Sequence, residues 1–152
     1  MTTCIVLSDS HNTLRIDQAT AELFEHADKI LHLGDGRRDA EQLRALYSDK
    51  LISIEGNCDG GTEAFRIVEI EDARILITHG HMLRVKSGTE TLHAECLAQG
   101  VSCGLYGHTH RPAVETYGNL KLINPGAWKD GCYCYLTVAG NRILARNVIK
   151  GK

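Results

Sequence analysis

The sequence lacks a long apolar run: no stretch approaches the roughly 18 to 20 apolar residues of a membrane-spanning helix. Its first residues, Met1 to Leu7, lead into Ser8 and Asp9 without the basic and apolar segments of a signal peptide. An excess of charge of one sign is also missing, because 17 lysines and arginines stand against 19 aspartates and glutamates. Such a balance favours neither nucleic acid nor an anionic membrane as a partner. We therefore expect a cytoplasmic protein with no membrane partner and no specific nucleic-acid partner.

Repeats, low-complexity tracts and linkers are absent as well. The chain has 152 residues, of which 43% are apolar and 24% are charged. A chain of this length and composition buries most of its apolar surface in one core. We expect residues 1–152 to form a single domain.

Histidine and cysteine, in contrast, are frequent, with eight and six copies respectively. Both side chains bind transition metals. The cysteines form no Cys-x-x-Cys pair, and the nearest approach to one is Cys132-Tyr133-Cys134. All except Cys58 lie among apolar or small residues, where a reduced cysteine packs as a small hydrophobic side chain. Whether the sequence indicates a metal-binding site therefore depends on where the histidines lie.

Strand and helix patterns alternate in the first third of the chain. Strands are expected at 4–7, 29–33 and 51–54, and helices at 13–27, with Asn12 or Thr13 as the N-cap, and at 40–47. The later segments are expected to be a hairpin at 65–70 and 74–78, a helix at 88–99, and strands at 102–106, 114–117, 121–123, 132–138 and 142–149. This order favours an α/β fold in which two sheets pack together with helices outside.

Polar side chains follow five of these strands at the point where each strand ends. Ligands bind beyond the carboxyl ends of strands in open α/β sheets, so we expect these side chains to converge. If the loops are extended, residues two positions apart point the same way, and nearby glycines let the backbone turn sharply. Seven oxygen and nitrogen donors exceed what one tetrahedral ion needs and suggest two ions. The candidate ligands are Asp9, His11, Asp35, Asn57, His79, His108 and His110.

These segments resemble, in order and spacing, the five sequence blocks of the calcineurin-like metallophosphoesterases. The likeness is closest to the small, single-domain bacterial and archaeal phosphodiesterases and covers essentially the whole chain. The matching blocks are Asp9-Ser10-His11-Asn12, Gly34-Asp35, Gly56-Asn57-Cys58-Asp59, Thr78-His79-Gly80-His81 and Gly107-His108-Thr109-His110. The resemblance implies a four-layer αββα sandwich of two mixed β-sheets flanked by helices.

The resemblance also implies a ligand set and a reaction. Asp9, His11 and His110 would bind one divalent metal, Asn57, His79 and His108 would bind the other, and Asp35 would bridge the two. A hydroxide between the metals would hydrolyse a small phosphodiester, with monoesters as a further candidate. Mn²⁺ is expected first because the donors are carboxylate, amide and imidazole groups, and Ni²⁺, Zn²⁺ and Fe²⁺ stay open.

One position departs from the larger phosphatases of this family, which carry histidine where this chain has Cys58. A thiol is a poor acid for the leaving group, so we expect His81 or a metal-bound water to serve instead. We expect catalysis to depend on Asp35, Asn57 and His81. Asp59 is expected to orient a histidine or the region of Cys58. Elsewhere we interpret Arg37 and Arg38 as a charged helix entry, and His26, His32 and His93 as ordinary structural residues.

A second class of function stays open, because the resemblance extends to a retromer subunit that serves as an interaction module. Such a non-catalytic metal-binding scaffold is expected to have lost at least one ligand, and all seven positions are filled here. A homo-oligomer formed through an exposed late strand also stays open.

Overall fold

The computed structural model describes residues 1–150, and residues 151 and 152 of the expected domain lie outside the described part. Two five-stranded sheets have the orders β10-β9-β1-β2-β3 and β4-β5-β6-β8-β7. The strands are β1 (Thr2–Leu7), β2 (Lys29–His32), β3 (Leu51–Ser53), β4 (Arg66–Ile70), β5 (Ala73–Ile77), β6 (Cys103–Leu105), β7 (Ala113–Tyr117), β8 (Leu120–Asn124), β9 (Cys132–Ala139) and β10 (Arg142–Ile149). The helices are α1 (Gln18–His26), α2 (Arg37–Tyr47) and α3 (Glu90–Gln99), with short 3₁₀ helices η1 (Asn57–Asp59), η2 (His81–Leu83), η3 (Val85–Ser87) and η4 (Trp128–Asp130).

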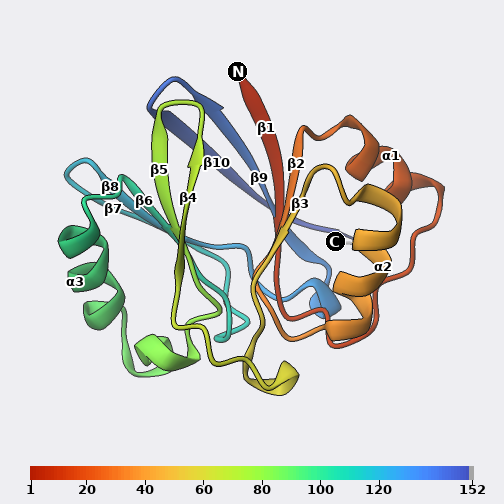
Figure 1. Ribbon diagram of the computed structural model, residues 1–152, viewed down its shortest axis with the longest axis horizontal. Helices are drawn as coiled ribbons and strands as arrows, with labels where there is room; N and C mark the ends of the chain where they lie inside the picture. The colour runs from red at the N-terminus through yellow and green to blue at the C-terminus, as the bar shows by residue number, and fades with distance from the viewer. Residues whose placement is uncertain (151–152) are drawn as a thin grey trace.

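The two sheets pack face to face, and the helices cover their outer faces (Figure 1). Strand β1 shows how an apolar run produces this layering. Cys4 and Val6 point into the core between the sheets, whereas Ile5 and Leu7 point into a second core beneath α1 and α2. A third core joins the other sheet to Leu92 of α3. The expected αββα sandwich is therefore confirmed.

Both sheets are mixed, as expected. In the first, β1 pairs in parallel with β2 and antiparallel with β9; in the second, β5 and β6 are parallel while β4 and β5 form the expected hairpin. The loops after the parallel strands meet along the lower edge of Figure 1. Backbone hydrogen bonds join them, from Asp9 N to Gly34 O at 2.9 Å and from Gly107 N to His79 O at 3.0 Å. The fold thus gathers the polar segments that follow five strands.

The start of the first helix differs from the expectation. Helix α1 begins at Gln18, five residues after Thr13, and its N-cap is Asp17, whose carboxylate accepts from Thr20 N at 2.8 Å. The side chain of Asn12 instead accepts from Arg38 N at the start of α2, at 3.1 Å. Asn12 therefore caps a helix that lies far along the chain.

Other limits differ by a few residues. Helix α2 begins at Arg37 where Ala40 is expected, and α3 begins at Glu90 where Gly88 is expected. The four 3₁₀ helices lie in segments expected to be loops. None of the helices between residues 1 and 150 has the length and the apolar character that crossing a bilayer requires.

Candidate metal centre

Six of the seven expected ligands lie in two groups at the edge where the loops meet. Asp9, His11 and His110 form one group, and Asp35, His79 and His108 form the other. Within each group, one potential ligand atom from every residue lies within 4.8 Å of the others. These two groups match the division between two ions that the sequence resemblance implies, while a third group, His11, Asp35 and Cys58, joins the two sides.

The first group surrounds one buried oxygen of Asp9. Its Oδ1 atom lies 3.2 Å from His110 Nε2 and 3.8 Å from His11 Nε2, yet no described residue hydrogen-bonds to it. The side chain of Asp9 is fully buried. Because a buried carboxylate oxygen without a partner is costly, this arrangement fits a cation held between the three side chains.

Asp35 lies between the two groups. Its Oδ2 atom is 3.3 Å from His79 Nε2 and 4.0 Å from His11 Nε2, and its Oδ1 accepts from Cys58 N at 2.8 Å. Burial works to raise the pKa of Asp35, but the hydrogen bond and charge of His79 and the amide of Cys58 hold it well below its usual range. Asp35 is therefore an anion whose two oxygens face different neighbours.

Hydrogen bonds on the far side of the ring orient His79. Its Nδ1 lies 2.8 Å from the carbonyl oxygen of Leu33, which can only accept, so Nδ1–H donates and Nε2 faces the site, 3.3 Å from Asp35 Oδ2. That Nε2 lies 3.2 Å from His108 Nδ1. Burial, followed by the charges of His79 and Lys86, lowers the pKa of His108 to about 4. Two ring nitrogens, from the loops after β5 and β6, thus face each other.

Asn57, the seventh expected ligand, lies at the rim. It begins η1, its side chain is exposed, and its Nδ2 faces Cys58 Sγ at 3.7 Å. The neighbouring amide of Cys58 is bound to Asp35, which keeps Asn57 close to the second group. Its role as a ligand stays a prediction.

Several residues at the site have a left-handed backbone conformation, whereas extended loops were expected from the sequence. The φ angles are 54° at Asp9, 48° at His11, 61° at Asp35, 71° at His108 and 64° at His110. A left-handed conformation costs a non-glycine residue about 1 to 2 kcal/mol, and such strain collects at functional sites. The expectation of extended segments is therefore wrong, although the side chains converge.

Glycine is required where the loops touch. A Cβ atom on Gly107 would collide with the hydroxyl of Ser8 and approach Asp9 Oδ2 to 2.8 Å. The same carboxylate oxygen accepts from His108 N at 2.9 Å. Only a glycine lets the loop after β6 approach the loop after β1 this closely.

His32, interpreted from the sequence as ordinary, lies beneath the site. Its Nδ1 accepts from Gly34 N at 3.1 Å, so Nε2 carries the hydrogen and donates to Ser10 Oγ at 2.9 Å. Burial lowers the pKa of His32 to about 4, which keeps the ring neutral. It joins the loop that carries Asp9 to the loop that carries Asp35. The only feature of the sequence that could have indicated this role is the position of His32, three residues before Asp35.

Asp59 holds the backbone around Asp35. Its carboxylate accepts from the backbone N–H groups of Asp35 at 2.7 Å, Gly36 at 3.1 Å and Gly56 at 3.0 Å. It thus orients a loop, where the sequence suggested a histidine or the region of Cys58. Arg37 donates to Glu55 Oε2 at 3.3 Å and to the carbonyl of Asp59, so it contacts neighbouring loops from the helix entry.

The two candidates for leaving-group protonation differ in their surroundings. The thiol of Cys58 is exposed, and partial burial and the charge of Asp35 raise its pKa. His81 Nε2 lies 3.2 Å from the carbonyl of Gly61, to which it can only donate, while its buried Nδ1 has no hydrogen-bond partner among residues 1–150. The ring centroid of His81 lies 6.2 Å from that of His108. His81 is therefore the better placed of the two.

Comparisons with known proteins find related sequences and similar folds. Residues 1–139 match the model of the calcineurin-like phosphoesterase superfamily domain. The phosphodiesterase YfcE of Escherichia coli is 32% identical over 147 residues, which cover 79% of this chain and 76% of that protein. Across the curated relatives, the matched region spans from 66% to 85% of their length.

Solved structures share the fold. A conserved protein of Streptococcus pneumoniae, described as a predicted phosphoesterase, superposes with a TM-score of 0.80 at 23% identity, covering 97% of this chain and 89% of that one. Vps29 of Chaetomium thermophilum superposes with a TM-score of 0.75 at 19% identity, covering 97% of each chain. At these identities the likeness concerns the fold alone.

Proposed function

The chain belongs to the calcineurin-like phosphoesterase superfamily, and we propose that it is a phosphodiesterase acting with two divalent cations on a small phosphorylated substrate. The observation that carries the proposal is the pair of ligand groups that meet at Asp35. The relationship to a named phosphodiesterase at 32% identity supports the choice of a diester. We also propose that residues 1–152 act as one unit, because one core joins the two sheets.

We propose that Asp9, His11 and His110 hold one cation and that Asn57, His79 and His108 hold the other, with Asp35 between them. The orphaned Oδ1 of Asp9 and the facing nitrogens of His79 and His108 support this division. When bound, two divalent cations lower the pKa of water and neutralise charge on the phosphoryl oxygens. Mixed carboxylate, amide and imidazole donors favour Mn²⁺, with Ni²⁺, Zn²⁺ and Fe²⁺ as alternatives.

The remaining roles belong to residues around the ligands. His81 in its protonated form would donate a proton to the departing oxygen, and its contact with the carbonyl of Gly61 would orient the ring. Asp59 and His32 would keep the loops of Asp35 and Asp9 in place through their hydrogen bonds to backbone and to Ser10. Each of these roles can be tested by substitution.

The test is hydrolysis of bis-p-nitrophenyl phosphate by metal-stripped protein, with Mn²⁺, Ni²⁺, Zn²⁺ and Fe²⁺ added back separately. We expect at least one metal to restore activity and Asp35→Asn to reduce it by about 100-fold or more, since even the outer partners of metal ligands contribute about 10- to 100-fold. Asp72→Asn, which changes an exposed carboxylate in the β4–β5 loop, is the matched control. If no metal restores hydrolysis, the enzyme proposal fails, and thermal stabilisation by metal without hydrolysis would favour the non-catalytic scaffold.

A further inference from the structure

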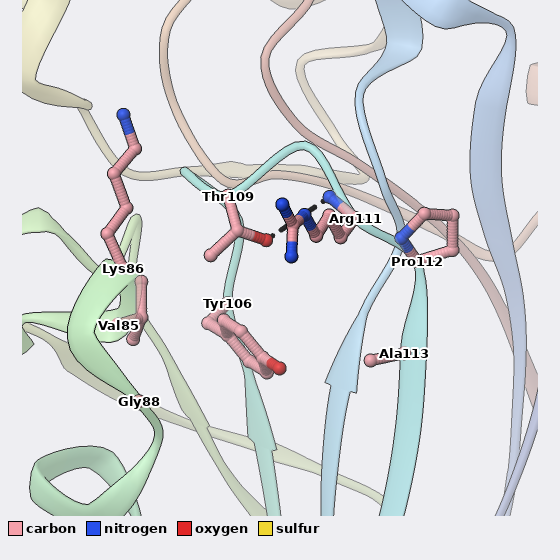
Figure 2. Close-up of a pocket in the computed structure, with 8 residues that line it drawn as sticks. All are labelled: Val85, Lys86, Gly88, Tyr106, Thr109, Arg111, Pro112 and Ala113. Atoms are coloured by element: carbon pink, nitrogen blue, oxygen red, sulfur yellow. Dashed lines mark hydrogen bonds between the residues drawn. The ribbon is translucent and has the colours of Figure 1, made fainter.

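A cavity of about 620 Å³ opens beside the candidate metal centre, and we call it the Tyr106 pocket (Figure 2). Its walls come from η3, from the loop after β6, and from the residues that lead into β7; they include Val85, Lys86, Tyr106, Thr109, Arg111 and Ala113. Thr109 lies between the candidate ligands His108 and His110 in the sequence, so one wall of the pocket belongs to the loop that carries these two ligands. Its volume is within the range of small-molecule sites, about 300 to 1,000 Å³.

One part of the lining is apolar. Tyr106 and Val85 are each only 4% exposed, and Figure 2 shows the Tyr106 ring between Val85 on one side and Ala113 on the other. The ring is held in place, since its hydroxyl faces Glu115 Oε1 at 3.5 Å. These buried side chains give the cavity an apolar wall against which a flat apolar group of a ligand can pack.

The other part of the lining is cationic. Lys86 and Arg111 are exposed side chains, and no carboxylate lines the pocket within the described chain. Neither cation forms an ion pair with another residue between 1 and 150, so both charges are available to a ligand.

Thr109 provides a directional contact at the boundary of the pocket. Its Oγ1 accepts from Arg111 N at 3.2 Å and from Asn124 Nδ2 at 3.0 Å. Both partners are donors, so the hydroxyl hydrogen of Thr109 remains for a ligand oxygen.

We infer that the Tyr106 pocket receives one ester arm of the phosphodiester and selects an arm that combines an aromatic ring with a second anionic group. The ring would pack against the apolar wall of the Tyr106 pocket, and the anion would pair with Lys86 and Arg111. The inference rests on the proposed function, because that function places the reacting phosphorus beside His108 and His110. It adds the substrate class and the residues that select it.

The first test compares three p-nitrophenyl phosphodiesters with the same leaving group and different second arms. These arms are methyl, which is too small to fill the pocket, choline, which is cationic, and thymidine 3′-phosphate, which joins a ring to an anion. We expect kcat/KM to be highest for the thymidine 3′-phosphate arm, by about 10-fold over methyl, and lowest for choline, as hydrogen bonds to charged groups suggest. Equal values for all three arms would overturn the inference.

Variants locate the selectivity. Lys86→Ala and Arg111→Ala should each reduce the preference for the thymidine 3′-phosphate arm toward the methyl value. Arg74→Ala, which removes an exposed arginine on β5, is the control and should retain the preference. Ala113→Phe would fill the pocket without changing its charge. It should therefore slow hydrolysis of the ester with the thymidine 3′-phosphate arm and leave hydrolysis of the methyl ester unchanged. Selectivity unchanged in all three pocket variants would contradict the assignment.

A binding experiment that needs neither metal nor turnover separates the inference from the proposed function. We expect thymidine 3′-monophosphate to shift the amide NMR signals of Val85, Lys86, Thr109 and Arg111 in metal-free protein, and thymidine to shift them less. Added salt should weaken the phosphate-dependent part. If the nucleotide binds but no diester is hydrolysed, the inference about the pocket holds and the proposed phosphodiesterase function is wrong. If diesters are hydrolysed without selectivity between the arms and without signal shifts, only the inference about the pocket is wrong.

Discussion

The Oδ1 atom of Asp9 lies 3.2 Å from the Nε2 atom of His110, and neither a backbone nor a side-chain donor of residues 1–150 reaches that oxygen. The other oxygen of the same carboxylate accepts from the hydroxyl of Ser8 at 2.7 Å and from the amide of His108 at 2.9 Å. One half of this carboxylate is therefore held by the protein, while the other half faces imidazole nitrogens. This is the arrangement of a ligand oriented before its cation arrives.

Asp9→Asn should separate metal binding from folding. The Asn oxygen can still accept from Ser8 and His108, and its NH₂ group can donate toward His110 where the carboxylate oxygen had no partner. We expect the metal-free variant to melt at or above the wild-type temperature. Mn²⁺ at about 100 times its Kd should stabilise the wild type by about 2.7 kcal/mol and the variant far less. Thermal melting with and without metal measures both, and Asp72→Asn is the control. An unchanged metal response would exclude Asp9 as a ligand.

His32 should make the metal-free protein acid-sensitive. Burial lowers its folded pKa to about 4, while an unfolded histidine has a pKa near 6.5. Between these values the unfolded chain binds more protons, so the stability that neutral His32 contributes is complete above about pH 6.5 and falls toward pH 4, by about 3 kcal/mol in total. Urea unfolding at pH 7 and pH 4.5 should show a smaller loss for His32→Gln than for wild type. His26→Gln, on the exposed end of α1, should keep the wild-type loss. Equal losses for His32→Gln and wild type would show that His32 does not titrate in this way.

The layers of the fold were predictable from the sequence because each depends on many residues. The run Cys4 to Leu7 is apolar at every position, and such a run indicates a strand covered on both faces. The candidate ligands were predictable for a related reason: the parallel strands that precede them end at one edge. Local errors in strand length do not alter either conclusion.

Details that depend on single contacts between distant segments were not predictable. Asn12 caps α2 because the fold brings Arg38 beside it, and the sequence around Asn12 suggests a cap for its own helix. His32 contacts Ser10, and Asp59 contacts the backbone amides of Asp35 and Gly36; these partners lie at least 22 residues away, so no local pattern predicts them. The left-handed φ angles of Asp9 and His108 likewise arise from the loops that enclose them.

Cys58 should be the one thiol that alkylation reaches in the native protein. The other five cysteines are buried, and burial raises the pKa of Cys4 and Cys134 to about 12 and that of Cys96 to about 11. The raised pKa of Cys58 should also make its reaction slow below pH 8. Mass spectrometry after iodoacetamide treatment should find one modification, and Cys58→Ser should remove it while retaining hydrolysis. Labelling of a second cysteine in native protein would contradict the burial, and loss of hydrolysis would give the thiol a role in the reaction.

His81 should matter in proportion to how poorly the leaving group departs. A phenolate with a high pKa needs a proton as the ester bond breaks, whereas p-nitrophenolate departs without one, and a positioned acid contributes about 100-fold or more. We therefore expect His81→Ala to slow hydrolysis of a phenyl ester of methyl phosphate by about 100-fold and to change the p-nitrophenyl ester little. His26→Ala, which removes an exposed histidine, should affect neither ester.

A structural role for His81 predicts a different pattern. Its contact with the carbonyl of Gly61 supports the segment after η1, and loss of that support would slow both esters by the same factor. Added imidazole distinguishes the two roles, because a free base with a pKa near neutrality can replace a missing proton donor and cannot replace a missing hydrogen bond between loops. If imidazole restores hydrolysis of the phenyl ester alone, the proton transfer is assigned to His81. Equal slowing of both esters without rescue would leave the leaving group to be protonated by solvent.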